Sequence, residues 1–304
     1  MDLKKYKGEL GLLVTAMIWG GGFAASKAAL ETNLTPYQIT GIRFFIGALL
    51  LSAVYHKHFK NLNSRILLSG MLLGFFLCAA FTLQTMGLQY TTASKNAFLT
   101  AINVVMVPFI GLAFFHEKID VYGIAGGFLA AAGAGVLMLN GAFTVNIGDV
   151  LTLLCALCFA FHIYCVGIFV KTCDAVLLTI IQFAFACVFS VPMILLFPGG
   201  QSSIGVNGVF ALLYLGVLST GVAFLLQNVS QTLTTSTRAA IILSSESVFG
   251  SLASVLFLGE ALTFRTVLGC LMIIAAVLIV ETKLPFLNRS RPKENVLGQD
   301  GGRE

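Results

Sequence analysis

Charged side chains are scarce in this sequence. They make up 10% of its 304 residues, whereas hydrophobic residues make up 58% and the mean hydropathy is +0.94. A soluble domain carries about 25% charged residues, so this chain has too few ionised groups to cover a water-facing surface. The shortage excludes a soluble globular fold and indicates that lipid is the solvent for much of the surface.

Signatures of enzymes and of nucleic-acid-binding proteins are missing as well. The sequence has no Gly-rich phosphate loop with its Lys, no Gly-x-Ser-x-Gly elbow and no His-Glu-x-x-His pair, which argues against ATP-driven transport and against the hydrolases that these motifs mark. No basic stripe interleaved with aromatic residues suggests a nucleic-acid partner. Nearly all of the seven cysteines lie in apolar runs, where no disulfide framework is expected. We therefore predict a protein that is not an enzyme and that binds no cofactor or metal.

Long apolar stretches are abundant. A membrane helix needs roughly 20 mostly apolar residues to cross about 30 Å of hydrocarbon. Ten stretches reach that length, at residues 10–30, 37–55, 66–88, 96–115, 122–140, 148–169, 175–197, 208–231, 238–258 and 265–281. The first is longer than the core of a signal peptide, so it is expected to remain as an uncleaved helix. The sequence predicts an all-α membrane protein with ten transmembrane helices.

Lysine and arginine are concentrated in alternate loops. If the N-terminus is cytoplasmic, fourteen of the eighteen basic residues fall on the cytoplasmic side, and only Lys95 and Arg265 lie in outer loops. Cytoplasmic loops of membrane proteins carry such an excess. We predict a multi-pass protein of the cell (inner) membrane with both termini in the cytoplasm and a disordered polar tail at residues 284–304.

The second half of the chain repeats the first. The aligned positions include, at an offset of 143 residues, Thr91 with Thr234, Thr92 with Thr235, Lys95 with Arg238 and Glu117 with Glu260; at 140, Gly8-Glu9 with Gly148-Asp149; and at 139, Arg43-Phe44 with Gln182-Phe183. The predicted units are residues 8–141 and 147–282, with five helices each. Five is odd, so the second unit enters the membrane from the opposite face. Inverted repeats of this kind recur in secondary transporters.

Several short segments carry a recognisable pattern. They are Ile18-Trp19-Gly20 followed by Phe23 and Lys27, Pro36 followed by Arg43-Phe44, the stretch from Thr91 through Pro108 to Lys118, and its repeat from Thr234 to Glu260. These segments resemble the EamA-type members of the drug/metabolite transporter superfamily over residues 8–282. The resemblance implies two tandem EamA-like repeats around a central cavity, and export of amino acids, other metabolites or drugs. His116 departs from the Gly that precedes the Glu in the second unit, with little expected effect on substrate choice.

Polar side chains near the middle of the spans are candidate substrate contacts, because polar groups are costly in lipid. Glu246 lies near the midpoint of the ninth span and its repeat counterpart, Asn103, near the midpoint of the fourth. A carboxylate at this depth could bind a substrate ammonium, or accept a coupling proton because burial favours the neutral form. Glu246 is thus the predicted proton-coupling residue. The alternative is a structural Glu held by neighbouring helices.

The first span contains three consecutive glycines between Trp19 and Phe23. The glycines permit either local unwinding beside a substrate or close packing of another helix. The two aromatic side chains could stack on an apolar or aromatic substrate. Lys27 could bind a substrate carboxylate or neutralise Glu31, four residues away.

The full predicted substrate site is Trp19, Phe23, Lys27, Gln84, Asn103, His162, Tyr164, Gln227, Arg238, Ser245 and Glu246. Arg238 and its counterpart Lys95 could guide anions or extend to the membrane interface as snorkelling cations. The resemblance assigns the deeper Arg43 a structural partner. Cys155, Cys158 and His162 share one helix face, but three ligands from one helix point too nearly parallel to hold a metal ion.

These observations predict a secondary-active transporter of small organic solutes that exports amino acids or related metabolites by alternating access. A multidrug or nucleotide-sugar-type carrier of the same fold is an alternative. A membrane enzyme acting on lipid-linked substrates is another, although it would need paired carboxylates that the sequence lacks. The expected partners are a small-molecule substrate and the lipid bilayer, without nucleic acid, in a monomer or a homodimer.

Overall fold

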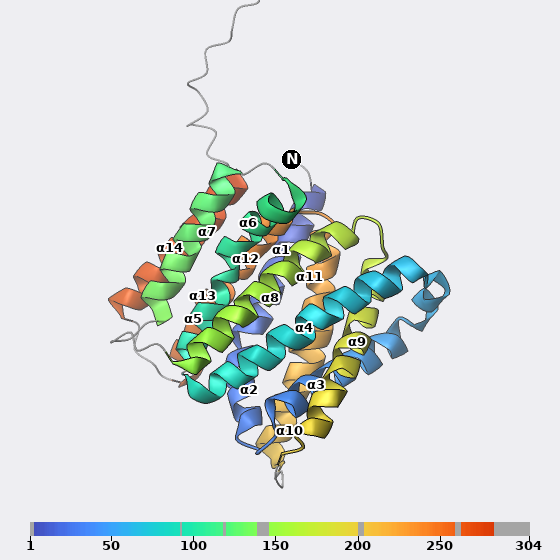
Figure 1. Cartoon of the computed structure of the whole chain (residues 1–304). Helices are drawn as coiled ribbons and strands as arrows, with labels where there is room; N and C mark the ends of the chain where they lie inside the picture. Colours follow the sequence, from blue (N-terminus) through green and yellow to red (C-terminus); the bar gives the residue numbers. More distant parts are fainter. Residues whose placement is uncertain are drawn as a thin grey trace, which may run out of the picture.

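The computed structural model describes residues 3–91, 93–117, 120–138, 146–199, 204–258 and 263–282, and every regular element in these ranges is helical (Figure 1). The elements are α1 (Leu3–Gly20), α2 (Gly22–Leu30), α3 (Pro36–Val54), η1 (His56–Asn61), α4 (Ser64–Tyr90), α5 (Ala93–Ala101), α6 (Asn103–Phe115), α7 (Val121–Met138), α8 (Ile147–Phe169), α9 (Ala175–Leu196), α10 (Val206–Leu213), η2 (Tyr214–Val222), α11 (Ala223–Gln231), α12 (Ser236–Leu243), α13 (Glu246–Leu258) and α14 (Phe264–Thr282).

The helices fall on the ten predicted segments. Among the described residues, seven segments are long and apolar enough to cross a membrane, and two shorter apolar helices, Val121–Val136 and Phe264–Val280, match two more. The remaining segment, 238–258, is divided between α12 and α13. The all-helical membrane fold is confirmed, while the count of ten crossings stays a prediction. So does the orientation, and the tail at 284–304 lies outside the described residues.

Large apolar side chains face outward from helices throughout the molecule. Leu49 on α3, Phe75 on α4, Leu195 on α9 and Phe264 on α14 are all exposed, Leu195 over 75% of its surface. Exposed apolar area on this scale would be strongly unfavourable in water. It is the surface expected of helices that contact lipid tails.

Three predicted spans are interrupted near their midpoints. The first breaks at Gly21, the fourth at Ile102 and the ninth at Ser244-Ser245. At the third break, Ser244 Oγ donates a hydrogen bond to the Ile241 carbonyl oxygen at 2.6 Å, and such local bonds compete with the helical ladder. Interrupted helices are tolerated at membrane depth only where protein or a cavity surrounds the freed backbone groups.

Helix packing follows the internal repeat. α4 packs along α8 and α9, and the corresponding span of the second half, α10–η2–α11, packs along α1 and α3. α7 lies beside α14, and α3 beside α9, so each of these helices contacts its own repeat counterpart (Figure 1). The two halves are therefore related by the approximate twofold symmetry that the sequence offsets predict.

The same relation is visible at single residues. A Cβ atom added at Gly148 would lie 2.7 Å from the Gly87 carbonyl oxygen, and one added at Gly8 would lie 3.1 Å from the Ser230 carbonyl oxygen. Gly8 and Gly148 are counterparts at offset 140, and Gly87 and Ser230 at offset 143. The same close approach between two helices therefore occurs twice, at positions related by the repeat.

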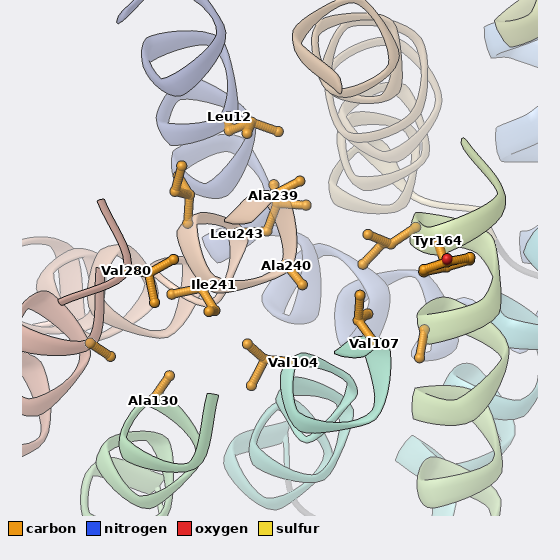
Figure 2. Packing of buried hydrophobic residues seen from close by; sticks show 14 of the residues in the cluster. Leu12, Val104, Val107, Ala130, Tyr164, Ala239, Ala240, Ile241, Leu243 and Val280 are labelled. Carbon is orange, nitrogen blue, oxygen red and sulfur yellow. The ribbon is translucent and has the colours of Figure 1, made fainter. Parts of the chain in front are cut away.

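Apolar side chains fill the space between the fourth, sixth and ninth spans. Val104 and Val107 of α6 pack with Ala240 and Ile241 of α12 and with Tyr164 of α8 (Figure 2). This cluster packs against one side of the interrupted fourth and ninth spans, and the polar residues of these spans lie on the other side.

An ion pair joins α5 to α8. Lys95 Nζ lies 2.6 Å from Asp149 Oδ2, and the side chains are 19% and 5% exposed. Asp149 Oδ2 also accepts a bond from the Asn146 backbone N–H at 2.9 Å, as part of the cap of α8. Both interpretations of Lys95, as a guide for anions or a snorkelling cation, overlooked this pairing of two helices.

The α1 terminus meets α13 through backbone atoms. A Cβ atom at Gly20 would lie 2.8 Å from the Gly250 backbone nitrogen and 3.0 Å from the Glu246 carbonyl oxygen. Backbone atoms cannot rotate out of the way as a flexible side chain can. Of the two uses proposed for the glycine run, close packing is therefore present at Gly20. Gly21 interrupts the helix for one residue but keeps right-handed helical dihedral angles, so local unwinding beside a substrate stays a prediction.

We expect Asp149→Asn to lower stability by about 2 kcal/mol, because a hydrogen-bonded charge loses its ionised partner. The measurement is the fraction of detergent-solubilised protein that remains monodisperse after heating. Glu31→Gln, which removes an exposed carboxylate, is the control and should leave the melting temperature unchanged. Equal melting temperatures for the two variants would contradict a stabilising role for the Lys95–Asp149 pair.

We expect Gly20→Val to destabilise the protein by about 1–3 kcal/mol, the usual range for overpacking, because α1 and α13 must separate. The same heating assay measures it. Gly221→Ala is the matched control, since its added Cβ would meet no atom closer than 3.5 Å. If Gly20→Val melts with the wild type, the close approach does not constrain these helices.

Candidate functional site

A cavity with an empty volume of about 670 Å³ lies where the interrupted helices meet. This volume includes space that is open to the solvent. Its walls are formed by Trp19, Gly22, Phe23, Ser26, Arg43, Phe81, Gln84, Thr100, Ala101, Asn103, Phe159, His162, Ile163, Ser219, Phe224, Gln227, Leu243, Ser244 and Glu246.

The cavity wall is built from equivalent positions of the two halves. Of the nineteen lining residues, sixteen form eight pairs at the repeat offsets: Trp19 with Phe159, Gly22 with His162, Phe23 with Ile163, Phe81 with Phe224, Gln84 with Gln227, Thr100 with Leu243, Ala101 with Ser244 and Asn103 with Glu246. A cavity lined in this way lies between the halves and belongs to neither one.

Aromatic rings form much of the apolar wall. The ring centroids of Trp19 and Phe224 are 4.9 Å apart, and those of Phe81 and Phe159 are 5.0 Å apart. Trp19 Nε1 donates to the Ser219 carbonyl oxygen at 2.9 Å, which fixes the indole plane. Ser219 lies in η2, a π-helix. π-turns are common at functional sites, and here one turns a backbone carbonyl toward Trp19.

Glu246 is the first residue of α13, and its counterpart Asn103 is the first residue of α6. Each therefore starts the second segment of an interrupted helix. The positive end of the helix dipole favours a carboxylate at such a position. Among the described residues, the Glu246 side chain takes part in no ion pair or hydrogen bond. It is a carboxylate facing the cavity without a protein partner.

Three other polar lining groups are bonded within the protein. Gln84 Nε2 donates to Thr100 Oγ1 at 3.2 Å, and Gln227 Nε2 donates to Gln231 Oε1 at 2.9 Å. His162 is fully buried, and its Nε2 lies 3.0 Å from Gln182 Oε1. These bonds fix the side chains in place while each residue still contributes to the wall.

Arg43 carries the other charge on the lining. Its Nε donates to Thr220 Oγ1 at 2.9 Å and its Nη2 to Ser219 Oγ at 3.1 Å. The guanidinium carbon lies 3.7 Å from the centre of the Phe81 ring, a cation–π contact. The residue is 2% exposed, and sequence reasoning placed it outside the candidate site.

Seven of the eleven predicted site residues line the cavity. They are Trp19, Phe23, Gln84, Asn103, His162, Gln227 and Glu246. They come from six different predicted spans, so the structure brings together residues far apart in sequence. Their roles toward a substrate stay predictions.

The other four predicted site residues lie off the cavity lining, and their roles toward a substrate likewise stay predictions. Lys27 is exposed, and its neighbour Ser26 is the last residue of α2 that lines the cavity. Tyr164 is 2% exposed and its ring lies 4.7 Å from Phe115, because two residues after His162 the helix has turned by about 200°. Ser245 is buried, and its neighbour Ser244 takes its place on the wall. Arg238 lies near the start of α12, two turns before the break.

The lining residues that sequence reasoning missed include three aromatic ones, Phe81, Phe159 and Phe224. Phe81 and Phe224 precede Gln84 and Gln227 by three positions in each half. That repeated Phe-x-x-Gln pattern was the signal available for them. Ser219 had no such signal, because a π-helix changes which residues share a face.

The cysteine and histidine residues of α8 form no metal centre. Cys155 is buried in an apolar cluster that includes Phe81 and Phe159, and His162 bonds to Gln182. Within the described residues, no group of three His, Cys, Asp or Glu side chains could hold a metal ion.

Comparison with known proteins places the chain in a family. The model of the EamA-like transporter family matches residues 6–139 and 146–282. An uncharacterized transporter of Archaeoglobus fulgidus is 33% identical over 283 residues, which cover 93% of this chain and 88% of that protein. The uncharacterized transporter YoaV of Bacillus subtilis is 25% identical over 293 residues, which cover 88% and 94%.

A solved crystal structure has the same fold. It superposes with a TM-score of 0.75 at 15% sequence identity and covers 92% of this chain and 98% of its own. Two matches to one family model, in tandem, agree with the repeat found in the sequence and in the packing. The chain belongs to the EamA-like transporter family.

Proposed function

We propose that this membrane transporter carries small organic solutes by alternating access and exports amino acids or related metabolites. The observation that carries the proposal is the cavity wall built from eight repeat-related pairs. Two equivalent halves can exchange their arrangements and so expose one central site to either side of the membrane. The direction, export, rests on the family resemblance.

The interrupted helices support the proposed motion. α5 and α6 in the first half, and α12 and α13 in the second, meet at Asn103 and Glu246 on the cavity. A break lets one segment tilt while the other stays packed, so rearrangement on one face need not disturb the other. Small conformational changes at such junctions are a common basis of domain closure around ligands.

The lining favours a small solute with an apolar part and a polar part. The aromatic rings of Trp19, Phe81, Phe159 and Phe224 suit an apolar substituent. Glu246 supplies a carboxylate that can bind an ammonium group. A nucleotide sugar would bring two phosphate charges, whereas Arg43 is the one cation on the described lining. The lining therefore favours an amine-bearing metabolite over that alternative.

Glu246 also offers a route for coupling. A substrate ammonium and a proton would compete for the same carboxylate, so release of one accompanies binding of the other. If the site binds protons on the outer face and substrate on the inner face, entry of a proton drives exit of the solute. Glu246 then acts in both substrate binding and proton coupling.

We expect Glu246→Gln to reduce transport of an amine-bearing substrate at least tenfold, a loss of about 1.4 kcal/mol or more in binding, and to abolish its dependence on a pH gradient. The substrate is first identified by comparing metabolites inside and outside cells that lack or overproduce the protein. Transport is then measured in proteoliposomes with and without an imposed gradient.

Two further variants serve as controls for this result. Glu246→Asp keeps a carboxylate and should keep the pH dependence at a lower rate. Glu31→Gln, an exposed site, should transport like the wild type. If Glu246→Gln leaves both the rate and the pH dependence unchanged, the coupling proposed for Glu246 fails.

A further inference from the structure

Arg43 breaks the twofold pattern of the cavity wall. Of the lining residues, Ser26, Arg43 and Ser219 are the three without a counterpart on the wall. At the offset of 139, Arg43 corresponds to Gln182. Gln182 is fully buried behind His162, to which it is hydrogen-bonded, and does not line the cavity. The first half therefore contributes a cation where the second half contributes none.

The guanidinium of Arg43 is held in one orientation. Hydroxyl groups of Ser219 and Thr220, both in the π-helix η2, accept its Nη2 and Nε protons, and the Phe81 ring covers one of its faces. An arginine has five N–H donors, and these two bonds leave three. A group fixed in this way is preorganised for a ligand in the cavity.

No acidic side chain in the described part of the chain neutralises this charge. Among the described residues, Arg43 forms no ion pair, and its hydrogen-bond partners are neutral. A charge buried at membrane depth is costly unless it is paired. An arginine that only joined α3 to η2 would be expected to have an acid or several carbonyl oxygens around it. The two hydroxyl groups and the Phe81 ring fix the orientation of the guanidinium group but do not neutralise its charge, which is available to another partner.

The other unpaired charge on the described lining is Glu246. The two charges come from different halves, Arg43 from α3 and Glu246 from α13, and they are not bonded to each other. Their counterparts, Gln182 and Asn103, are neutral. The cavity wall is therefore built from equivalent positions of the two halves but carries an asymmetric pair of charges.

We propose that Arg43 binds the carboxylate of a zwitterionic substrate whose ammonium group faces Glu246. The forked N–H groups of arginine match a carboxylate with two parallel hydrogen bonds. The proposal rests on the proposed transport function and makes Arg43 a specificity-determining residue. Because the charges are asymmetric, the substrate keeps one orientation while the two halves rearrange around it.

The test uses full-length protein in detergent and measures binding by isothermal titration. The probes are the twenty common amino acids and, for those that bind, the matching amine without the carboxylate and acid without the ammonium. For phenylalanine these are 2-phenylethylamine and 3-phenylpropanoate. The wild type should bind at least one amino acid about tenfold or more tighter than both of its analogues.

The decisive variant is Arg43→Gln, which installs the residue found at the counterpart position. Amino-acid affinity should fall about tenfold, to that of the amine, while affinity for the amine stays unchanged. Arg43→Lys should recover part of the difference, since it restores the charge without the fork. Lys27→Gln is the matched control, because it removes a cation from an exposed position off the cavity, and it should bind all three probes like the wild type.

Two results would overturn the proposal. One is an equal loss of affinity for amino acid and amine in Arg43→Gln, which would make Arg43 structural. The other is a wild-type protein that binds no zwitterion, or binds its amine equally well. Transport of any other solute in proteoliposomes would still leave the proposed function standing. If Arg43→Gln fails to fold, the Ser219→Ala, Thr220→Val double variant serves instead, and unchanged discrimination between amino acid and amine would then refute the proposal.

Discussion

Inside a bilayer the backbone has no water to bond with, so a crossing chain must keep its amide and carbonyl groups paired within the protein. In this chain three spans are nevertheless interrupted and a fourth widens into a π-helix. The first, fourth, eighth and ninth spans all contribute to one cavity wall. The irregular backbone and the cavity are therefore two aspects of one arrangement: the breaks are tolerated because they face the cavity, and the cavity has polar walls because helices break there.

The twofold relation between the halves and the charges in the cavity serve different needs. Equivalent packing, with α4 against α8 and α11 against α1, would allow the two arrangements of similar energy that the proposed alternating access needs. Selection of a solute needs the opposite, because a fully symmetric wall would hold a substrate in two orientations equally well. On the lining, Glu246 stands opposite a neutral counterpart, Asn103, and Arg43 has no counterpart. Under the proposed function, the symmetry is therefore broken at the two points where the substrate brings charge.

Much of the fold could be predicted from the sequence, because apolar run length and the repeat offsets report directly on membrane helices and their relation. The pairing of Glu246 with Asn103 came from the same offset. What could not be predicted was which side chains face the cavity once a helix is interrupted or widens into a π-helix. His162 and Tyr164 are two residues apart, yet one lines the cavity and the other packs on Phe115. The family resemblance assigned Arg43 a structural partner, and the sequence did not show that its hydrogen-bond partners are neutral.

Hydrogen bonding at membrane depth distinguishes the polar side chains that shape the site from those proposed to act in it. Gln84, Gln227 and His162 each form a hydrogen bond with another protein side chain, while Gln227 Oε1 and His162 Nδ1 have no partner among the described residues. Glu246 has no such partner among the described residues, and a lone carboxylate at this depth is strongly unfavourable. Under the proposed mechanism it must hold either a proton or a substrate ammonium at every stage. The exchange of the proton for the substrate ammonium then follows from the lack of a protein partner for Glu246, and no further group is needed to couple the two.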